Sequence, residues 1–243
     1  MKTRGVRFVA PLWLFAAALL LTGCAGVEPI RGEMHLGLDD APEGKRLLWP
    51  QAPEIPRYLY TGTLTGEQNF RRPGNGSDKL RDFGRWLVGL DAKPASPVVL
   101  QRPSAVIGDD QGRIFVSDTS RQAVFVFDQK AGELLVWERA DGLLNFVAPS
   151  GLALGAAGEL FVADAELGFV VRLDAKGEPR AVIGRNLLKR PTGLARDSAS
   201  GLLFVADTYA HDIKVFDAAG TLVRVIGGRG DGDGEFNFPT HLA

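Results

Sequence analysis

The sequence predicts an all-β fold, a β-propeller built from four-stranded blades, and three observations predict it. Glycine accounts for 30 of 243 residues without low complexity, which indicates many tight turns between short strands. Proline-led units of 42–48 residues recur along the second half of the chain. Each complete unit contains a strand that is apolar on both faces, so its neighbours must cover it. Units of this kind stack radially around a common axis.

Three markers at fixed spacing define the repeat. Each unit opens with a proline, carries an aspartate at the end of its second strand, and carries another at the end of its third strand. The two aspartates are ten residues apart in all three complete units. The opening prolines are Pro103, Pro149, Pro191 and Pro239, the second-strand aspartates are Asp118, Asp164 and Asp207, and the third-strand aspartates are Asp128, Asp174 and Asp217.

Four short strands are expected in each unit, in a fixed order. The first follows the proline, and a glycine turn leads from it to the second. The third ends at the later aspartate, and another glycine turn leads to the fourth. The fourth strands are expected at Leu134–Trp137, Arg180–Ile183 and Leu222–Ile226.

This pattern resembles the NHL repeat family, in which a proline leads the first strand and a sequence such as Leu160-Phe-Val-Ala-Asp164 ends the second. The resemblance covers residues 98–243 and implies NHL-type blades, six of them in a complete ring. Residues 238–243 match only the opening of a fourth unit, so we expect an N-terminal fragment of a longer protein. A short chain whose ring closes by oligomerisation is the alternative.

Two segments before the first unit are assigned by comparison with the repeat. Residues 57–70 are similar to residues 223–238, the fourth strand and exit loop of the last complete unit. Residues 54–70 are therefore expected to be an N-terminal strand that closes the propeller. Residues 71–97 are predicted to be an insertion with a short helix over 78–90, capped by Ser77. This helix is expected to pack on the propeller, with partner binding as the alternative.

The N-terminus has the features of an export signal. Three basic residues precede an apolar run, Phe8–Leu21, that is too short to span a bilayer. Leu21-Thr22-Gly23-Cys24 resembles the lipobox of bacterial lipoproteins, which implies that residues 1–23 are a signal peptide and that Cys24, the only cysteine, carries the lipid. An ordinary signal peptide with a chance cysteine is the alternative.

The residues after Cys24 suggest where the chain resides. Residues 24–53 are rich in proline and weakly periodic, so they are expected to form a flexible tether. Ala25 stands where an aspartate would resemble the signal for inner-membrane retention. The resemblance therefore implies anchoring in a bacterial cell envelope, at the outer membrane and facing the periplasm.

Few residues suggest chemistry. Asp118, Asp164 and Asp207 favour a structural role, because they recur at equivalent places whereas a single site needs different groups from different blades. His241 is a weak channel candidate, because it lies on the innermost strand of the fourth unit. The other units offer no ligand at the equivalent positions, which are Ala105, Gly151 and Gly193. We predict no catalytic residue, no metal site and no cofactor.

Two functions of different classes follow from these features. The formal net charge of −1 gives no electrostatic case for nucleic-acid binding. The first function is a lipid-anchored binding or scaffolding module with a protein partner in the envelope. The alternative is a metal-dependent enzyme, because similar propellers host lactonases and lyases; its site would lie mostly in the missing blades. Fold alone does not decide between them.

Overall fold

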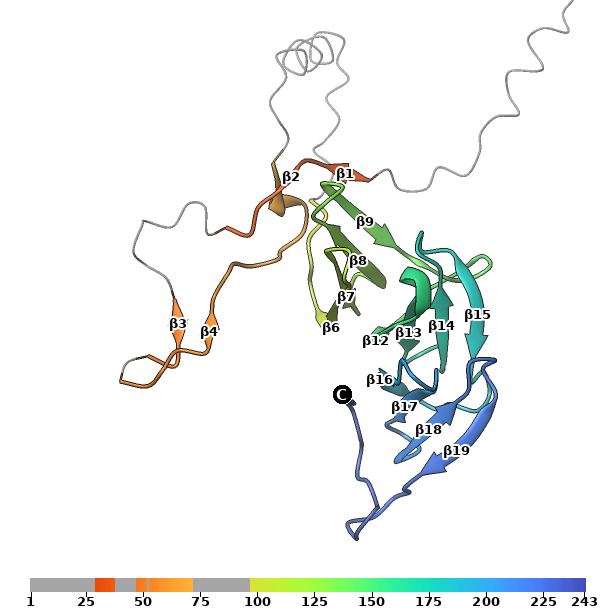
Figure 1. Ribbon diagram of the computed structural model, residues 1–243. Helices are drawn as coiled ribbons and strands as arrows, with labels where there is room; N and C mark the ends of the chain where they lie inside the picture. Colours follow the sequence, from red (N-terminus) through yellow and green to blue (C-terminus); the bar gives the residue numbers. More distant parts are fainter. Residues whose placement is uncertain (1–28, 38–46, 52, 72–96) are drawn as a thin grey trace, which may run out of the picture.

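The computed structural model describes residues 29–37, 47–51, 53–71 and 97–243. Three antiparallel sheets form successive blades, and they are arranged as an arc with the first strand of each blade on the concave side (Figure 1). The predicted all-β class and the four-stranded, propeller-type blades are confirmed. The predicted signal peptide, Cys24 and the helix over 78–90 lie outside the described residues. Within those residues, no helix is long and apolar enough to cross a bilayer.

Each blade has four strands in sequence order, which is the arrangement that the markers predicted. Short turns join consecutive strands, so every pairing is antiparallel. Blade 1 comprises β6 (Pro103–Gly108), β7 (Arg113–Asp118), β8 (Ala123–Asp128) and β9 (Glu133–Trp137). Blade 2 comprises β12 (Pro149–Leu154), β13 (Leu160–Asp164), β14 (Phe169–Leu173) and β15 (Pro179–Ile183). Blade 3 comprises β16 (Pro191–Arg196), β17 (Leu203–Asp207), β18 (Asp212–Phe216) and β19 (Leu222–Ile226).

The proline and the first aspartate of each unit are cross-strand partners. Pro103 lies opposite Asp118, and the same register places Pro149 opposite Asp164 and Pro191 opposite Asp207. In all three blades a register shift follows the proline directly. A proline donates no hydrogen bond, so it is suited to the first position of a strand beside such an irregularity. The two markers therefore define one end of each blade.

The cores of the molecule lie between blades, because the two faces of β13, the second strand of blade 2, pack against different neighbours. Phe115 of blade 1 packs with Leu160 and Val162 of blade 2. Phe161, on the opposite face of β13, packs with Val205 of blade 3. A blade therefore buries its apolar faces only by stacking, as the sequence predicted.

The third apolar cluster covers the face of blade 1 that points away from blade 2. Phe70 and Leu64 pack there against Phe125 and Phe127. Phe70 and Phe127 stack with their ring centroids 6.2 Å apart. Segments that precede the repeat therefore cover the face where a preceding blade would pack.

The structure of the N-terminal region differs from the expected tether and closing strand. Within residues 24–53, β1 (Ile30–Arg31) extends blade 1 by pairing with β9, and β2 (Glu33–Met34) pairs with β5 (Phe70–Arg71). Side-chain contacts explain this order, because Ile30 and Met34 pack on the blade 1 cluster. Residues 30–34 are therefore held against blade 1 and its neighbouring strand β5, and are not part of a free tether.

Residues 54–70 divide into two parts. β4 (Tyr58–Leu59) pairs with β3 (Leu48–Trp49) in a hairpin that stands away from the blades (Figure 1). Residues 64–70 instead follow blade 1 and include a short 3-10 turn, Glu67–Asn69. In the described residues this segment adds no strand to a blade.

Two further short elements were not predicted from the repeat. A two-stranded hairpin of β10 (Arg139–Asp141) and β11 (Leu144–Asn145) follows blade 1. A 3-10 turn over Ala156–Gly158 connects β12 to β13. Both lie in connections between strands, and the first also adds Ala140 and Phe146 to the buried cluster between blades 1 and 2.

Blade 3 contains a buried lysine where the other blades carry apolar side chains. Lys214 is 8% exposed, and Phe125 and Val171 occupy its repeat position in blades 1 and 2. Its Nζ atom donates to Asp207 Oδ2 at 2.9 Å and to Asp212 Oδ1 at 2.6 Å. A charge buried this far needs such partners, because desolvation is unfavourable for an unpaired ion.

Candidate functional site

A hollow of about 860 Å³ lies on the concave side of the arc. We call it the inner-strand hollow, because β6, β12 and β16 contribute half of the residues that line it. Small side chains and backbone dominate these strands where they face the hollow. The residues that line it include Ser104, Ala105, Val106, Ser150, Gly151, Thr192, Gly193, Thr240, His241 and Leu242.

The inner strands approach one another closely, backbone to backbone. A Cβ atom on Gly151 would lie 2.4 Å from the carbonyl oxygen of Thr192 in the next blade. A Cβ atom on Gly193 would lie 2.7 Å from the carbonyl oxygen of Thr240. These distances are shorter than any non-bonded carbon–oxygen contact, so glycine is required by close approach.

Hydroxyl groups join the inner strands where they meet. Ser117 Oγ donates to the carbonyl of Ser150 at 2.5 Å, and Ser150 Oγ donates to the carbonyl of Pro191 at 3.2 Å. Thr192 Oγ1 donates to the carbonyl of Thr240 at 3.1 Å. Hydrogen bonds of this kind satisfy backbone carbonyls that the ladder leaves open. For Ser150 and Thr192 the sequence signal was the hydroxyl residue that follows the proline, and sequence analysis did not assign it a role. Ser117 lies on β7 and does not follow a proline.

The second-strand aspartates fix the backbone at the edge of the hollow. Asp164 is fully buried and accepts backbone N–H groups from Val147 and Ala148 on one side and from Glu166 and Leu167 on the other. The first pair leads into β12 and the second pair forms the turn after β13. One carboxylate therefore ties two loops together, because its oxygens offer about four lone-pair positions.

The same arrangement recurs in blade 1 and changes in blade 3. Asp118 accepts the backbone N–H groups of Gln101 and Arg102 before β6 and those of Ser120 and Arg121 after β7. Asp207 accepts N–H groups from Lys189 and Arg190 before β16. In blades 1 and 2 the aspartate also accepts N–H groups from the turn after the second strand, whereas Asp207 accepts a hydrogen bond from the buried ammonium of Lys214.

These aspartate-bound loops carry the side chains at the rim of the inner-strand hollow. The residue before the opening proline is Arg102 in blade 1, Ala148 in blade 2 and Arg190 in blade 3, and all three line the hollow. Arg190 Nη1 lies 2.6 Å from Glu166 Oε1, and its guanidinium lies 4.9 Å from the ring centroid of Tyr209. The backbone of the rim is thus repeated, whereas its side chains differ between blades.

The third-strand aspartates have a different and more exposed role. Asp174 Oδ1 accepts the backbone N–H groups of Lys176 and Glu178 in the turn to β15, and Arg180 Nε donates to Oδ2 at 3.0 Å. The backbone hydrogen bond from Glu178 and the Arg180 guanidinium lower the pKa of Asp174 to about 2. Asp217 accepts two backbone N–H groups in the same way in blade 3.

His241 lies at the inner-strand hollow, on the segment that follows Pro239. Its side chain is exposed, and Nδ1 lies 2.9 Å from Thr240 Oγ1. The buried ring of His211 packs against this segment. Its Nδ1 accepts the Phe238 N–H at 3.3 Å, and the centroids of the His211 and Phe238 rings are 4.3 Å apart. Among the described residues, no three histidine, cysteine, aspartate or glutamate side chains are grouped as metal ligands.

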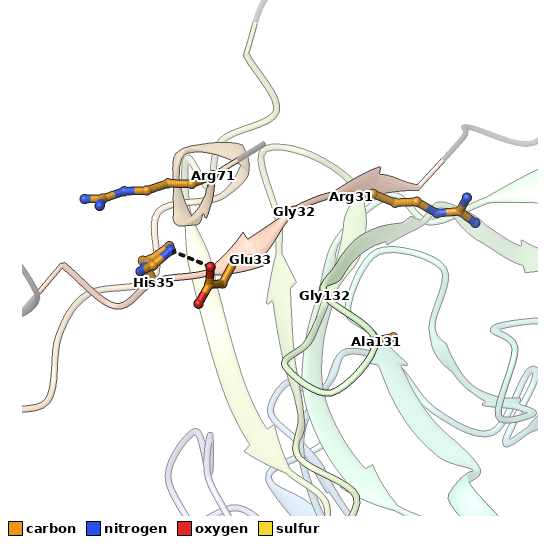
Figure 2. Close-up of a pocket in the computed structure, with 7 residues that line it drawn as sticks. All are labelled: Arg31, Gly32, Glu33, His35, Arg71, Ala131 and Gly132. Carbon is orange, nitrogen blue, oxygen red and sulfur yellow. Dashed lines mark ion pairs between the residues drawn. The ribbon is translucent and has the colours of Figure 1, made fainter. Parts of the chain in front are cut away.

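A second hollow, of about 590 Å³, lies where β1 and β2 cross blade 1. Figure 2 shows its side chains: Arg31 and Arg71 point in opposite directions, and Glu33 and His35 face one another. Arg31 Nε is hydrogen-bonded to Glu133 Oε1 at 2.8 Å, and His35 Nε2 lies 3.9 Å from Glu33 Oε2. Because these polar groups do not converge, this hollow is a weaker site than the first.

The fold and the inner-strand hollow define a protein of the β-propeller class. Its four-stranded blades stack face to face, and their first strands line the axis side. The family model of the NHL repeat matches residues 188–216, which run from the loop before β16 to the end of β18. The chain therefore has a β-propeller fold and contains an NHL repeat within its third blade. No curated protein sequence matches it significantly.

Several solved structures are similar to the chain in fold. Virginiamycin B lyase from Staphylococcus aureus matches with a TM-score of 0.43 and 14% identity, over 57% of this chain and 42% of that one. Hydrazine synthase from Kuenenia stuttgartiensis matches with a TM-score of 0.46 and 18% identity, over 62% and 41%. A nidogen/laminin complex matches with a TM-score of 0.42 and 18% identity, over 52% and 47%. The chain spans less than half the length of these structures.

Proposed function

We propose that this chain is a lipid-anchored binding or scaffolding module of a bacterial cell envelope, with the inner-strand hollow as its partner-binding surface. One observation carries the proposal: buried aspartates hold the rim loops in the same way in blades 1 and 2, while the rim side chains differ from blade to blade. A rigid backbone that carries varied side chains is the arrangement of a recognition surface. Arg102, Glu166 and Arg190 supply charge there, and the hydroxyl groups supply hydrogen bonds.

The surface suits a protein segment better than an enclosed small molecule. It is broad and open, β6, β12 and β16 are edge strands of their sheets, and the side chains of β6 alternate between exposed and half-buried along most of the strand. An extended segment of a partner can pair with such edges and place its acidic side chains on the rim arginines. The proposed partner is therefore an envelope protein that presents an acidic, extended segment.

Site-specific photocrosslinking in intact cells tests the binding surface. We expect benzoylphenylalanine at position 102 to form a protein adduct, and the charge reversal Arg190→Glu across the hollow to remove it. The matched control carries the crosslinker at Leu143, a fully exposed apolar residue between β10 and β11. Equal adducts at both positions, or none at position 102, would contradict the proposed surface.

The lipid anchor is tested separately at Cys24. We expect the wild-type chain to enter the detergent phase and a Cys24→Ser variant to remain in the aqueous phase, because the thioether-linked lipid and the N-terminal acyl chain both require this residue. Several buried acyl chains retain a protein stably, whereas one gives reversible binding. Retention of the Cys24→Ser variant in membranes at the wild-type level would refute the anchor.

A metal-dependent enzyme is the competing function, and His241 is the observation that favours it, because this side chain is exposed at the same hollow. The two functions differ in what a His241→Ala variant does. Binding through the rim predicts an unchanged adduct at position 102, whereas catalysis predicts loss of a metal-dependent turnover.

A further inference from the structure

One wall of the inner-strand hollow is formed by residues 238–242, which we call the fourth-unit segment. Beyond β19 the chain returns to the concave side of the arc, where its C-terminal end lies (Figure 1). Thr240, His241 and Leu242 line the hollow there. None of the sheets in the described residues includes this segment, so its place depends on contacts with blade 3.

Blade 3 holds the fourth-unit segment through hydrogen bonds between side chains and backbone. The hydroxyl groups of Thr208 and Thr192 donate to two of its carbonyl groups, at 2.7 Å and 3.1 Å. At the start of the segment the direction is reversed, because the Phe238 N–H donates to His211 Nδ1 at 3.3 Å. A hydroxyl group donates at any pH near neutrality, whereas an imidazole nitrogen accepts only when it carries no proton. The contact at His211 is therefore the one that titrates.

The backbone on both sides of this contact is in an unfavourable conformation. His211 has a φ of 59° and Phe238 a φ of 55°, in the left-handed region that bulky side chains rarely adopt. The ring of His211 is 7% exposed, and its centroid lies 4.3 Å from that of Phe238. Such a conformation persists where surrounding contacts impose it. Loss of the contact therefore allows the start of the segment to relax.

Protonation of His211 removes the acceptor that the Phe238 N–H needs. Both nitrogens of a charged imidazole carry hydrogen, so rotation of the ring offers no replacement. The charge would also lie in a buried position, where desolvation is unfavourable. Histidine changes charge in the range from about pH 5 to about pH 8. The hydrogen bond is therefore made at the upper end of this range and lost as the pH falls through it.

The carboxylates beside His211 in blade 3 are engaged by other donors. Asp207 accepts the Lys214 ammonium and two backbone N–H groups, and Asp212 accepts the same ammonium. Lysine keeps its proton throughout the range in which histidine titrates. The charged and titratable groups on the elements around the ring are Asp207, Asp212 and Lys214 in blade 3, Tyr209 in the same turn, Arg190 before β16 and His241 on the fourth-unit segment.

We propose that His211 is a pH-sensitive switch for the inner-strand hollow. Without its extra proton it holds the fourth-unit segment against blade 3, and with that proton it releases the segment and opens one wall of the hollow. The consequence rests on the proposed function, in which the hollow binds the partner. Partner binding is then weaker in an acidic medium than in a neutral one.

Spin labels on the full chain test the switch directly. Cys24→Ser leaves the chain without a cysteine, and the switch does not involve the lipid anchor. In this background, His241→Cys carries a nitroxide on the fourth-unit segment, and Val225→Cys, 48% exposed on β19, carries it on blade 3 itself. On going from about pH 8 to about pH 5, we expect a several-fold rise in the mobile fraction of the spectrum at position 241 and no change at position 225.

The same substitution at two histidines provides the matched control. The chain labelled at position 241 retains His35 and His211. Asparagine presents an oxygen that accepts a hydrogen bond, does not titrate, and tolerates a positive φ. With His211→Asn we expect a spectrum at position 241 that does not change with pH. With His35→Asn we expect the same response to pH as in the parent.

Three results would overturn the switch. They are a spectrum at position 241 that is the same at both pH values in the parent, a response to pH that survives His211→Asn, and an equal response at position 225, which would show that acid unfolds the blade as a whole. The photocrosslinked adduct at position 102 reports on the proposed function separately. Its absence at both pH values would contradict the binding surface and leave the result from the spin labels unaffected.

Discussion

Replacing Asp164 with alanine is expected to lower the free energy of unfolding by about 3–4 kcal/mol. The fully buried carboxylate accepts four backbone N–H groups, from Val147, Ala148, Glu166 and Leu167. Alanine leaves these donors without an acceptor and opens a small cavity beside them. Urea denaturation followed by circular dichroism measures the change.

Two further variants separate the hydrogen bonds from the general loss of an aspartate. Asp174→Ala removes a carboxylate from the same blade that serves an exposed turn, so a much smaller change is expected. Asp164→Asn keeps the shape but places an NH₂ group against backbone donors, so it should still destabilise clearly. An Asp164→Ala variant as stable as Asp174→Ala would show that the four hydrogen bonds contribute little.

Replacing Gly151 with alanine is expected to destabilise the protein by about 2–3 kcal/mol through overpacking. The added methyl group would lie 2.4 Å from the Thr192 carbonyl oxygen and 3.0 Å from the Leu194 nitrogen. Both atoms belong to the backbone of the neighbouring inner strand, so no side-chain rotation relieves the contact. Blades 2 and 3 must therefore move apart, and the Ser150 hydrogen bond to Pro191 is lost with that movement.

Gly108→Ala is the matched control, because it is an inner-strand glycine with room for a methyl group. The nearest atom to its Cβ would be the Arg113 carbonyl oxygen at 3.7 Å, an ordinary contact. Thermal unfolding should separate the two variants by several degrees. If Gly151→Ala and Gly108→Ala unfold at the same temperature, close approach of the inner strands does not limit this position.

Local patterns predicted the blades well, because their determinants lie within each unit. The ten-residue spacing between Asp164 and Asp174 contains one turn and one strand, and it is the same in the other two blades. The fourth strands also follow the predicted segments closely. Turn glycines and alternating apolar residues act over a few positions, so a single unit reveals them.

The N-terminal region and the site depended on contacts that no local pattern encodes. Ile30 pairs with Leu134, more than one hundred residues later, in a segment whose prolines suggested a tether. Ser150 Oγ donates to the carbonyl of Pro191 in the next blade, a partner that the hydroxyl residue after the proline does not reveal. Pairings of this kind depend on which surfaces meet, so the sequence indicates the residues without their partners.

The sequence by itself determined the blade: its four strands, its turns, and the proline and aspartate that meet at one end. These follow from backbone restriction, side-chain alternation and short-range hydrogen bonding. Only the tertiary structure decided which side chains of different blades lie together. Stacking brings Arg102, Glu166, Arg190 and His241 to one hollow, because surfaces far apart in the chain become neighbours only when the apolar faces between them are buried.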